Sequence, residues 1–294
     1  MRTIITSGLL LMLSASVMAA SYDESRPASA TSNIRFEGID GELRVEPWDR
    51  DEWRLSGELS AQVEEVEISG DSQSWSISLE YRRGGWQNWG RGGGHTDLTL
   101  NVPRSASLGV KLVSADLTVG ELDGEHLRLE TVSGRIIADA TAREVEIQSV
   151  SGDIRLRAGG STETRLESVS GDIEVGEVSG RLKVQAVSGD IEIRSARLHK
   201  ADFETVSGDL EINAELAAES DLELSSHSGD IELNINDVPL DLEVETFSGG
   251  ISSDWGKVER EKHGPGKSLN YRQGSGTAKV NINAFSGDVR VRQR

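Results

Sequence analysis

The sequence predicts an all-β protein: a parallel β-solenoid (β-helix) of about nine coils of 18–21 residues, closed at one end by an antiparallel N-terminal cap. Three observations support this fold class. A serine recurs at intervals of 18–21 residues from Ser114 to Ser248, and again at Ser286, two periods later. A glycine follows nearly every one of these serines. Apolar and polar residues alternate on both sides of each serine–glycine pair, as in two strands joined by a tight turn.

The alternation places an apolar column on each strand of the repeat. The residue four positions before each repeat serine and the residue three positions after it are apolar in every copy, as Leu129 and Ile136 are around Ser133. Glycine at the turn can adopt backbone angles that other residues reach only at a cost. We therefore expect structural turns at the glycines that share this place in the repeat: Gly134, Gly152, Gly171, Gly189, Gly208, Gly229, Gly249 and Gly287.

A single repeat unit is too small to fold alone. Burying about five aliphatic side chains stabilises a unit by on the order of 10 kcal/mol, whereas ordering about 19 residues costs roughly 20–40 kcal/mol. Stacked coils pair with the coils above and below, which makes the apolar columns continuous. Right-handed winding is expected from the usual handedness of crossovers. An antiparallel meander of hairpins is the alternative, but it does not require the same residue in the same column at every period.

The sequence divides into four segments. Residues 1–19 have the features of a secretory signal peptide, with Arg2, a short apolar run and a small residue at Ala19, after which cleavage is expected. A membrane anchor is the alternative, but the apolar run is too short to cross a hydrocarbon core of about 30 Å. The other segments are an N-terminal β cap with a long Gly/Arg/Trp hairpin loop (20–105), the repeat solenoid (106–253), and a basic insertion loop with the last coil (254–294).

The composition narrows the class of partner and the compartment. The chain has a formal net charge of −19 at pH 7, which argues against nucleic acid and anionic lipid as partners. It contains no cysteine, so the fold depends on burial and backbone pairing without disulfide bonds. We expect no transmembrane segment after signal cleavage. The sequence therefore predicts an exported protein, either periplasmic or secreted.

The tandem Val-Ser-Gly-Asp units, such as ESVSGDI at residues 167–173, resemble those of a known family. With an exported N-terminal segment of the type GELRVEPWDRDEWRLSGEL (residues 41–59), they are similar to the bacterial exported β-strand-repeat proteins labelled "putative adhesin", a family of unknown function. The resemblance covers roughly residues 33–294. It implies a repeat scaffold at the cell envelope, and it carries over no catalytic residue because the family has none established.

The segment YRRGGWQNWGRGGGH, residues 81–95, is the candidate for ligand contact. It is basic and aromatic on a strongly acidic chain; arginine pairs with phosphate or carboxylate, and exposed tryptophan can stack on sugar rings. The candidate ligand-binding residues are Arg82, Arg83, Trp86, Trp89 and Arg91. They suggest an envelope glycan or surface polymer as partner. The alternative is that Trp86 and Trp89 fold back and help to cover the open end of the solenoid.

The turn aspartates form a column that raises the question of a metal site. Carboxylates about 4.8 Å apart could attract Ca²⁺. However, Arg135 and Gly250 interrupt the column, and the paired glycines and nine-residue period of calcium-binding β-rolls are missing. We expect these aspartates to be solvated and to accept hydrogen bonds from nearby N–H groups. The sequence therefore predicts neither a metal nor a cofactor.

Two classes of function are compatible with these features. The repeat serines are equivalent, so none is marked as a nucleophile, and His227 falls in a column otherwise held by valine or phenylalanine. We favour a non-catalytic cell-envelope scaffold that serves adhesion or glycan contact. The alternative is a β-helix polysaccharide lyase or glycoside hydrolase. Such an enzyme needs clustered carboxylates with a basic residue in one groove, and the turns over residues 106–253 are too short to build one.

The aspartate column generates a simple test. If these carboxylates serve the backbone and hold no Ca²⁺, excess EDTA will leave the melting temperature of the purified mature protein unchanged. Circular dichroism with and without chelator measures this. A large drop on chelation that added Ca²⁺ restores would contradict the expectation.

Overall fold

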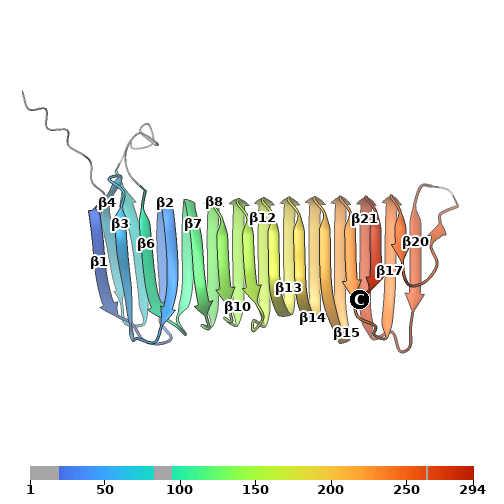
Figure 1. Cartoon of the computed structure of the whole chain (residues 1–294), viewed down its shortest axis with the longest axis horizontal. Coiled ribbons are helices and arrows are strands. Elements are labelled where there is room, and N and C mark those ends of the chain that lie inside the picture. Colours follow the sequence, from blue (N-terminus) through green and yellow to red (C-terminus); the bar gives the residue numbers. More distant parts are fainter. Residues whose placement is uncertain (1–19, 83–94, 263) are drawn as a thin grey trace, which may run out of the picture.

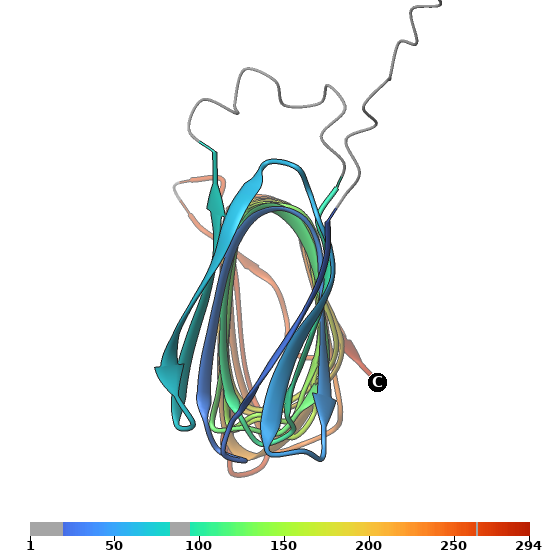
Figure 2. The same ribbon diagram turned by 90° about the vertical axis from the view of Figure 1, so that its left-hand side faces the viewer.

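The computed structural model describes residues 20–82, 95–262 and 264–294, and these form a β-solenoid (Figure 1). Every regular element of the described residues is a β-strand, so the predicted all-β solenoid class is confirmed. Across these residues there is no helix with the length and apolar character needed to span a membrane. Viewed along the long axis, each coil is a flattened loop whose two arms enclose a narrow interior (Figure 2). The expected signal peptide, residues 1–19, lies outside the described residues.

Each repeat coil has a first arm that ends at the repeat serine and a second arm that begins after the Gly-Asp turn. Five strands form a first arm only: β8 (His126–Ser133), β10 (Glu144–Ser151), β12 (Glu163–Ser170), β17 (Leu240–Ser248) and β21 (Ala278–Ser286). Five form a second arm only: β9 (Ile136–Ala140), β11 (Ile154–Ala158), β16 (Ile231–Ile235), β18 (Ile251–Ser253) and β22 (Val289–Gln293). Four continue around a corner: β7 (Ser107–Leu122), β13 (Ile173–Ser188), β14 (Ile191–Ser207) and β15 (Leu210–Ser228).

Neighbouring coils pair in parallel, with equivalent residues opposite each other. Ser133 of β8 pairs with Ser151 of β10, which pairs in turn with Ser170 of β12. The residues four before these serines, Leu129 and Ile147 among them, are fully buried between the arms. Burial of the first-arm and second-arm apolar columns produces one continuous core along the solenoid.

The serine–glycine–aspartate corners pack backbone against backbone. A Cβ atom on Gly189 would lie 2.4 Å from the carbonyl oxygen of Gly171 in the neighbouring coil, and one on Gly171 would lie 2.5 Å from that of Gly152. Gly189 also has a φ of +130°, which L side chains rarely adopt. Gly189 is therefore required for contact as well as for conformation. We call this side of the solenoid, where the repeat turns stack, the turn edge.

The N-terminal end is covered by a mixed sheet, whereas the sequence predicts an antiparallel cap. Its strands are β1 (Ala20–Pro27), β2 (Asn33–Trp48), β3 (Glu52–Leu59), β4 (Val63–Asp71), β5 (Ser74–Tyr81) and β6 (Asp97–Pro103). The pairs β1–β3, β3–β6 and β4–β5 are antiparallel, whereas β2 continues the parallel stack by pairing with β7, β5 and β6. Trp53 is fully buried here, and its ring meets Trp75 edge-on at 5.6 Å between centroids. These aromatic rings close the core at this end.

The last coil in the sequence is not the last coil in space. β21 pairs in parallel with β15 on one side and with β17 on the other, so the final coil lies between two coils that precede it in the chain. β22 pairs likewise with β16 and β18. The outer edge of β17 is covered by β20 (Lys267–Arg272), which runs antiparallel to it and pairs with the short β19 (Glu259–Arg260). In chain order, the covering strands β19 and β20 therefore precede β21 and β22, although β21 and β22 lie on the inner side of β17 and β18.

The corner packing predicts different effects for two glycine substitutions. Gly189→Ala places a methyl group against the Gly171 carbonyl at positive φ, and it should lower the free energy of unfolding by on the order of 1–3 kcal/mol. Gly176→Ala is the matched control, because the nearest atom to its added Cβ is 4.0 Å away. Urea titrations followed by circular dichroism compare the two variants. Equal stability of both would contradict the corner geometry.

Candidate binding trough along the turn edge

The residue just before each repeat serine points out of the solenoid and is apolar in most coils. Strict alternation explains its direction, because the residues two and four positions before the serine face the core. We call this column the apolar row. In spatial order it consists of Val113, Val132, Val150, Val169, Val187, Val206, His227, Phe285 and Phe247. The valines and phenylalanines of the row are 37–51% exposed, so the row is an uninterrupted strip of half-exposed side chains.

Aromatic rings form the C-terminal third of the apolar row. The ring of His227 stacks on Phe285 with 4.8 Å between centroids and 7° between planes. Phe285 stacks in turn on Phe247 at 5.1 Å and 8°. Most ring faces are therefore covered by neighbouring rings, and the row presents mainly ring edges to a partner. The intercalated last coil creates this stack, since it brings Phe285 between the other two rings.

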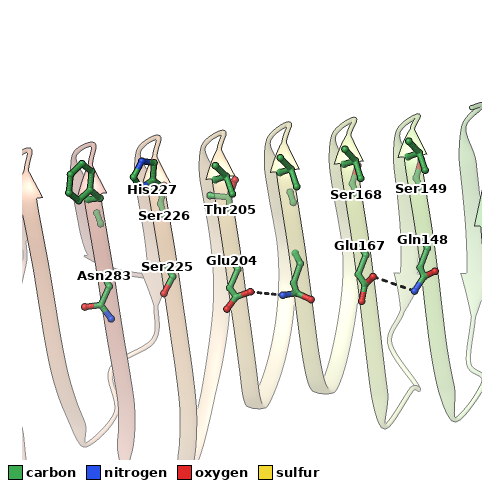
Figure 3. Close-up of a pocket in the computed structure, with 18 of the residues that line it drawn as sticks. Gln148, Ser149, Glu167, Ser168, Glu204, Thr205, Ser225, Ser226, His227 and Asn283 are labelled. Carbon is green, nitrogen blue, oxygen red and sulfur yellow. Dashed lines mark hydrogen bonds between the residues drawn. The ribbon is translucent and has the colours of Figure 1, made fainter. Parts of the chain in front are cut away.

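A second outward column lies two residues before the apolar row, and we call it the polar row. In spatial order it consists of Lys111, Glu130, Gln148, Glu167, Gln185, Glu204, Ser225, Asn283 and Glu245. No two acidic residues are neighbours in it, which avoids like-charge repulsion at the strand spacing of about 4.8 Å. Gln148 Nε2 donates to Glu167 Oε2 at 3.3 Å, and Gln185 donates to Glu204 in the same way (Figure 3).

The two rows are the walls of a trough of about 1290 Å³ that follows the turn edge. Its floor is the first-arm backbone at the residue between the two rows, which is small in every coil except the first, where it is Leu112. The hydroxyls of Ser149 and Ser168 turn inward and donate to the carbonyl oxygens of Gly152 and Gly171 at 2.9 and 3.1 Å. The hydrogen-bonding groups offered to a partner therefore come mainly from the polar row.

The N-terminal end of the polar row differs from the rest of the row in how its charge is balanced. Lys111 Nζ lies 3.1 Å from Glu130 Oε2, and Arg128 Nε lies 2.6 Å from Glu130 Oε1. Burial alone would raise the pKa of Glu130, but the hydrogen bonds from Arg128 and Lys111 outweigh it and lower that pKa. Within residues 20–82, 95–262 and 264–294, no lysine, arginine or histidine forms an ion pair with Glu167, Glu204 or Glu245. The trough therefore presents carboxylates without a cationic partner.

The turn aspartates are engaged by the backbone of the neighbouring coil. Asp190 Oδ1 accepts the N–H of Asp209 at 2.8 Å, and Asp209 Oδ1 accepts that of Asp230 at 2.8 Å. Asp230 Oδ1 accepts the N–H of Asp288 at 2.8 Å, and this bond, with the Arg290 ion pair, lowers the pKa of Asp230 despite partial burial. The described residues contain no group of three or more histidine, aspartate and glutamate side chains arranged to hold a metal ion.

A second, smaller hollow of about 460 Å³ lies at the corner opposite the turn edge. It is lined by both acidic and basic side chains, as a lyase or hydrolase site would be, so the pairing and the exposure of these side chains bear on whether it could serve as one. Arg157 pairs with Asp139 at 3.1 Å, and Arg197 pairs with Glu215 at 3.2 Å. All four of these side chains are well exposed to solvent. They form cross-coil ion pairs on a solvated surface, whereas the acid of a lyase or hydrolase needs a desolvated carboxyl group.

Comparison with known proteins places the chain in a family. The family model named Toastrack DUF4097 matches residues 31–238. This chain belongs to the Toastrack DUF4097 family. The resemblance inferred from the tandem Val-Ser-Gly-Asp units is thereby confirmed. A search among curated proteins finds no match.

Solved structures similar to this Toastrack chain span nearly its whole length. One is a "putative adhesin" from Bacteroides fragilis, 12% identical, with a TM-score of 0.48 over 95% of this chain and 99% of that one. A "putative adhesin" from Parabacteroides merdae is 10% identical, with a TM-score of 0.45 over 93% and 96%. A "putative lipid binding protein" from Parabacteroides distasonis is 11% identical, with a TM-score of 0.34 over 93% and 96%.

The candidate ligand residues named from the Toastrack sequence fall mostly outside the described part of the chain. Arg83, Trp86, Trp89 and Arg91 lie there, and only Arg82 is placed. Arg82 is exposed at the end of β5, and its N–H donates to the carbonyl of Gln62 at 3.0 Å. Since β5 stacks in parallel on β2, Arg82 is on the turn edge, at the N-terminal side of the apolar row.

The apolar row is a surface feature that reasoning from the sequence did not single out. In the sequence, His227 falls in this column together with valines and phenylalanines, and no contact surface is predicted from it. The alternation of inward and outward residues along the first arm does predict that this column faces outward. Val169 is one residue from the buried Ser168 and two from Glu167, and therefore shares the outward face of Glu167.

The turn aspartates, linked from coil to coil by hydrogen bonds, form what we call the aspartate ladder. This ladder predicts how stability depends on pH. The pKa of Asp230 is lower in the folded protein than in the unfolded chain, so its contribution is present above the unfolded pKa and is lost as pH falls through the folded pKa. Between about pH 5 and pH 3, wild type should lose more unfolding free energy than Asp230→Asn, by less than about 1 kcal/mol because the group is largely exposed. Denaturant titrations across this range measure the difference.

A control variant separates the effect of the ladder hydrogen bonds on stability from the effect of net charge. Asp51→Asn removes the same charge, and the Asp51 carboxylate accepts no hydrogen bond from the described residues. Asp51→Asn should follow the wild-type pH profile. If Asp230→Asn also follows it, the ladder does not supply the pH dependence.

Proposed function

We propose that this Toastrack protein is an exported, non-catalytic binding scaffold of the cell envelope, and that its contact surface is the trough on the turn edge. The observation that carries the proposal is the apolar row. Its nine members, stacked at about 4.8 Å, extend over roughly 40 Å. Contiguous exposed apolar surface beside polar residues is typical of interaction sites.

The proposed location at the envelope rests on two features of the sequence. Residues 1–19 have the pattern of a secretory signal peptide, and the family resemblance is to exported proteins. The absence of cysteine is compatible with either the periplasm or the exterior, because the fold uses no disulfide. We propose export, periplasmic or secreted, on these grounds.

The proposal of a non-catalytic role rests on the chemistry of the two hollows. In the trough, Glu130 has a lowered pKa, whereas a general acid at neutral pH needs a raised one. At the opposite corner, Arg157 and Arg197 are exposed and already paired with Asp139 and Glu215. A lyase or hydrolase would need at least one of these carboxyl groups desolvated and unpaired.

The basic segment 81–95 is proposed as a second contact for an envelope glycan or surface polymer. Its described end, Arg82, lies on the same edge as the trough. The opposite end of the trough is bounded by Lys267 and Glu261 from the β19–β20 hairpin. A partner that follows the turn edge would therefore meet cationic side chains at both ends of an acidic trough.

A retention experiment tests the binding role. The purified mature protein is mixed with cell-envelope fractions of the bacterium that makes it, and the bound fraction is measured after sedimentation. The triple variant Val169→Thr, Val187→Thr and Val206→Thr removes apolar area from the middle of the trough while keeping side-chain shape and strand preference. We expect it to retain less than about a tenth of wild-type binding, since these half-exposed side chains form the contact.

A control and a stability measurement make the result decisive. Ile137→Thr changes a residue with 37% exposure on the second arm, away from the trough, and should bind like wild type. Thermal melts should show all variants folded, because a hydroxyl at these exposed positions still reaches water. Undiminished retention of the triple variant, or turnover of an envelope polysaccharide by the wild-type protein, would overturn the proposal.

A further inference from the structure

We infer that the trough binds an extended basic polypeptide segment that carries a lysine or arginine at every third position. The inference rests on the proposed binding function and names the class of partner. It follows from the charges of the polar row, the shape of the apolar row, the closed backbone of the floor and the spacing of the carboxylates.

The polar row selects for positive charge. Glu167 and Glu204 have no ion-pair partner in the described part of the chain, although the outer surface of the solenoid otherwise carries many cross-coil ion pairs. Each accepts one glutamine N–H, from Gln148 or Gln185, which orients the carboxylate and leaves an oxygen available (Figure 3). The net charge of −19 adds a long-range attraction for cations.

The apolar row selects for aliphatic contact in the same partner. Lysine and arginine have long aliphatic stems that can lie along Val169 and Val187 while the charged head reaches the polar row opposite. A sugar ring would instead need an open aromatic face for stacking. In this row the ring of Phe285 is covered by His227 on one face and by Phe247 on the other. These contacts favour a polypeptide over a glycan within the trough.

The floor of the trough excludes strand addition as the mode of binding. β10 pairs with β8 on one edge and with β12 on the other, and β12 pairs with β10 and β13. The backbone N–H and C=O groups beneath the trough are therefore used by neighbouring coils. A bound segment must be recognised through its side chains, which permits an extended conformation without internal hydrogen bonds.

The spacing of the carboxylates sets the spacing of the basic residues. Glu167 and Glu204 are two coils apart, with Gln185 between them, and this places them about 9.6 Å from each other along the trough. A polyproline II segment rises about 3.1 Å per residue and repeats every three residues, so its positions i and i+3 are about 9.3 Å apart on one side. Consecutive basic residues of a three-residue repeat thus meet consecutive carboxylates.

A peptide-binding experiment tests the inference on the full mature protein. The probe is a fluorescently labelled peptide of four Lys-Pro-Val repeats, and fluorescence anisotropy measures its Kd. The comparison peptide has the same composition with its lysines contiguous, which keeps the charge and removes the period. The protein variant is Glu167→Gln with Glu204→Gln. Its control is Glu211→Gln with Glu232→Gln, which changes net charge equally on the second arms of β15 and β16.

We expect the periodic peptide to bind wild type at least about tenfold more tightly than the contiguous-lysine peptide, because only the periodic one pairs with both carboxylates. The Glu167/Glu204 variant should weaken the periodic peptide by about tenfold or more and reduce the dependence of Kd on salt, whereas the control should change it less than about twofold. Circular dichroism melts verify that both variants are folded.

Other results overturn the inference. Equal weakening by the two variants would mean that the peptide responds to net charge alone, and equal binding of the two peptides would remove the three-residue period. If the periodic peptide does not bind while the triple threonine variant still loses envelope retention, the polypeptide inference fails and the binding scaffold stands. Undiminished retention by the triple variant would instead refute the scaffold function itself.

Discussion

The close backbone contact between successive serine–glycine–aspartate corners is the constraint on which the rest of the structure depends. A Cβ atom at Gly189 would lie within 2.4 Å of the Gly171 carbonyl, so each corner has one arrangement relative to the next. The aspartate hydrogen bonds, such as Asp209 N–H to Asp190, hold the same register from the outside. Because a strand slip of one residue would exchange its inward and outward faces, this fixed register also decides which side chains are buried along both arms.

The exact register turns a repeated sequence into continuous surface rows. Side chains at one place in the repeat stack at the strand spacing, so a half-exposed valine in one coil becomes an apolar strip over many coils. The same stacking would set like charges side by side, and the polar row avoids this by placing Gln148 and Gln185 between glutamates. The trough therefore exists only in the stacked coils, because a single coil contributes one residue to the apolar row and one to the polar row.

The C-terminal end shows that chain order and stacking order can differ in a solenoid. Parallel pairing needs a strand on each side, and the edge of the last coil would be exposed to other chains. The protein covers β17 with the antiparallel β20 and then inserts β21 between β15 and β17. This insertion also joins Phe285 to the aromatic stack and pairs Arg290 with Asp230, which extends both the apolar row and the aspartate ladder toward the end.

The sequence by itself determined the all-β class, the coil length and the inward columns, since Leu129, Ile147 and their equivalents recur at one phase of a period-two pattern. The outward direction of Val169 follows from the same phase, although its half-exposed state depends on how the corner bends. Only the tertiary structure decided that Phe285 lies between His227 and Phe247. The physical reason is that coils pair through contacts between distant residues, and a sequence period states which residues are equivalent without stating which coils are neighbours.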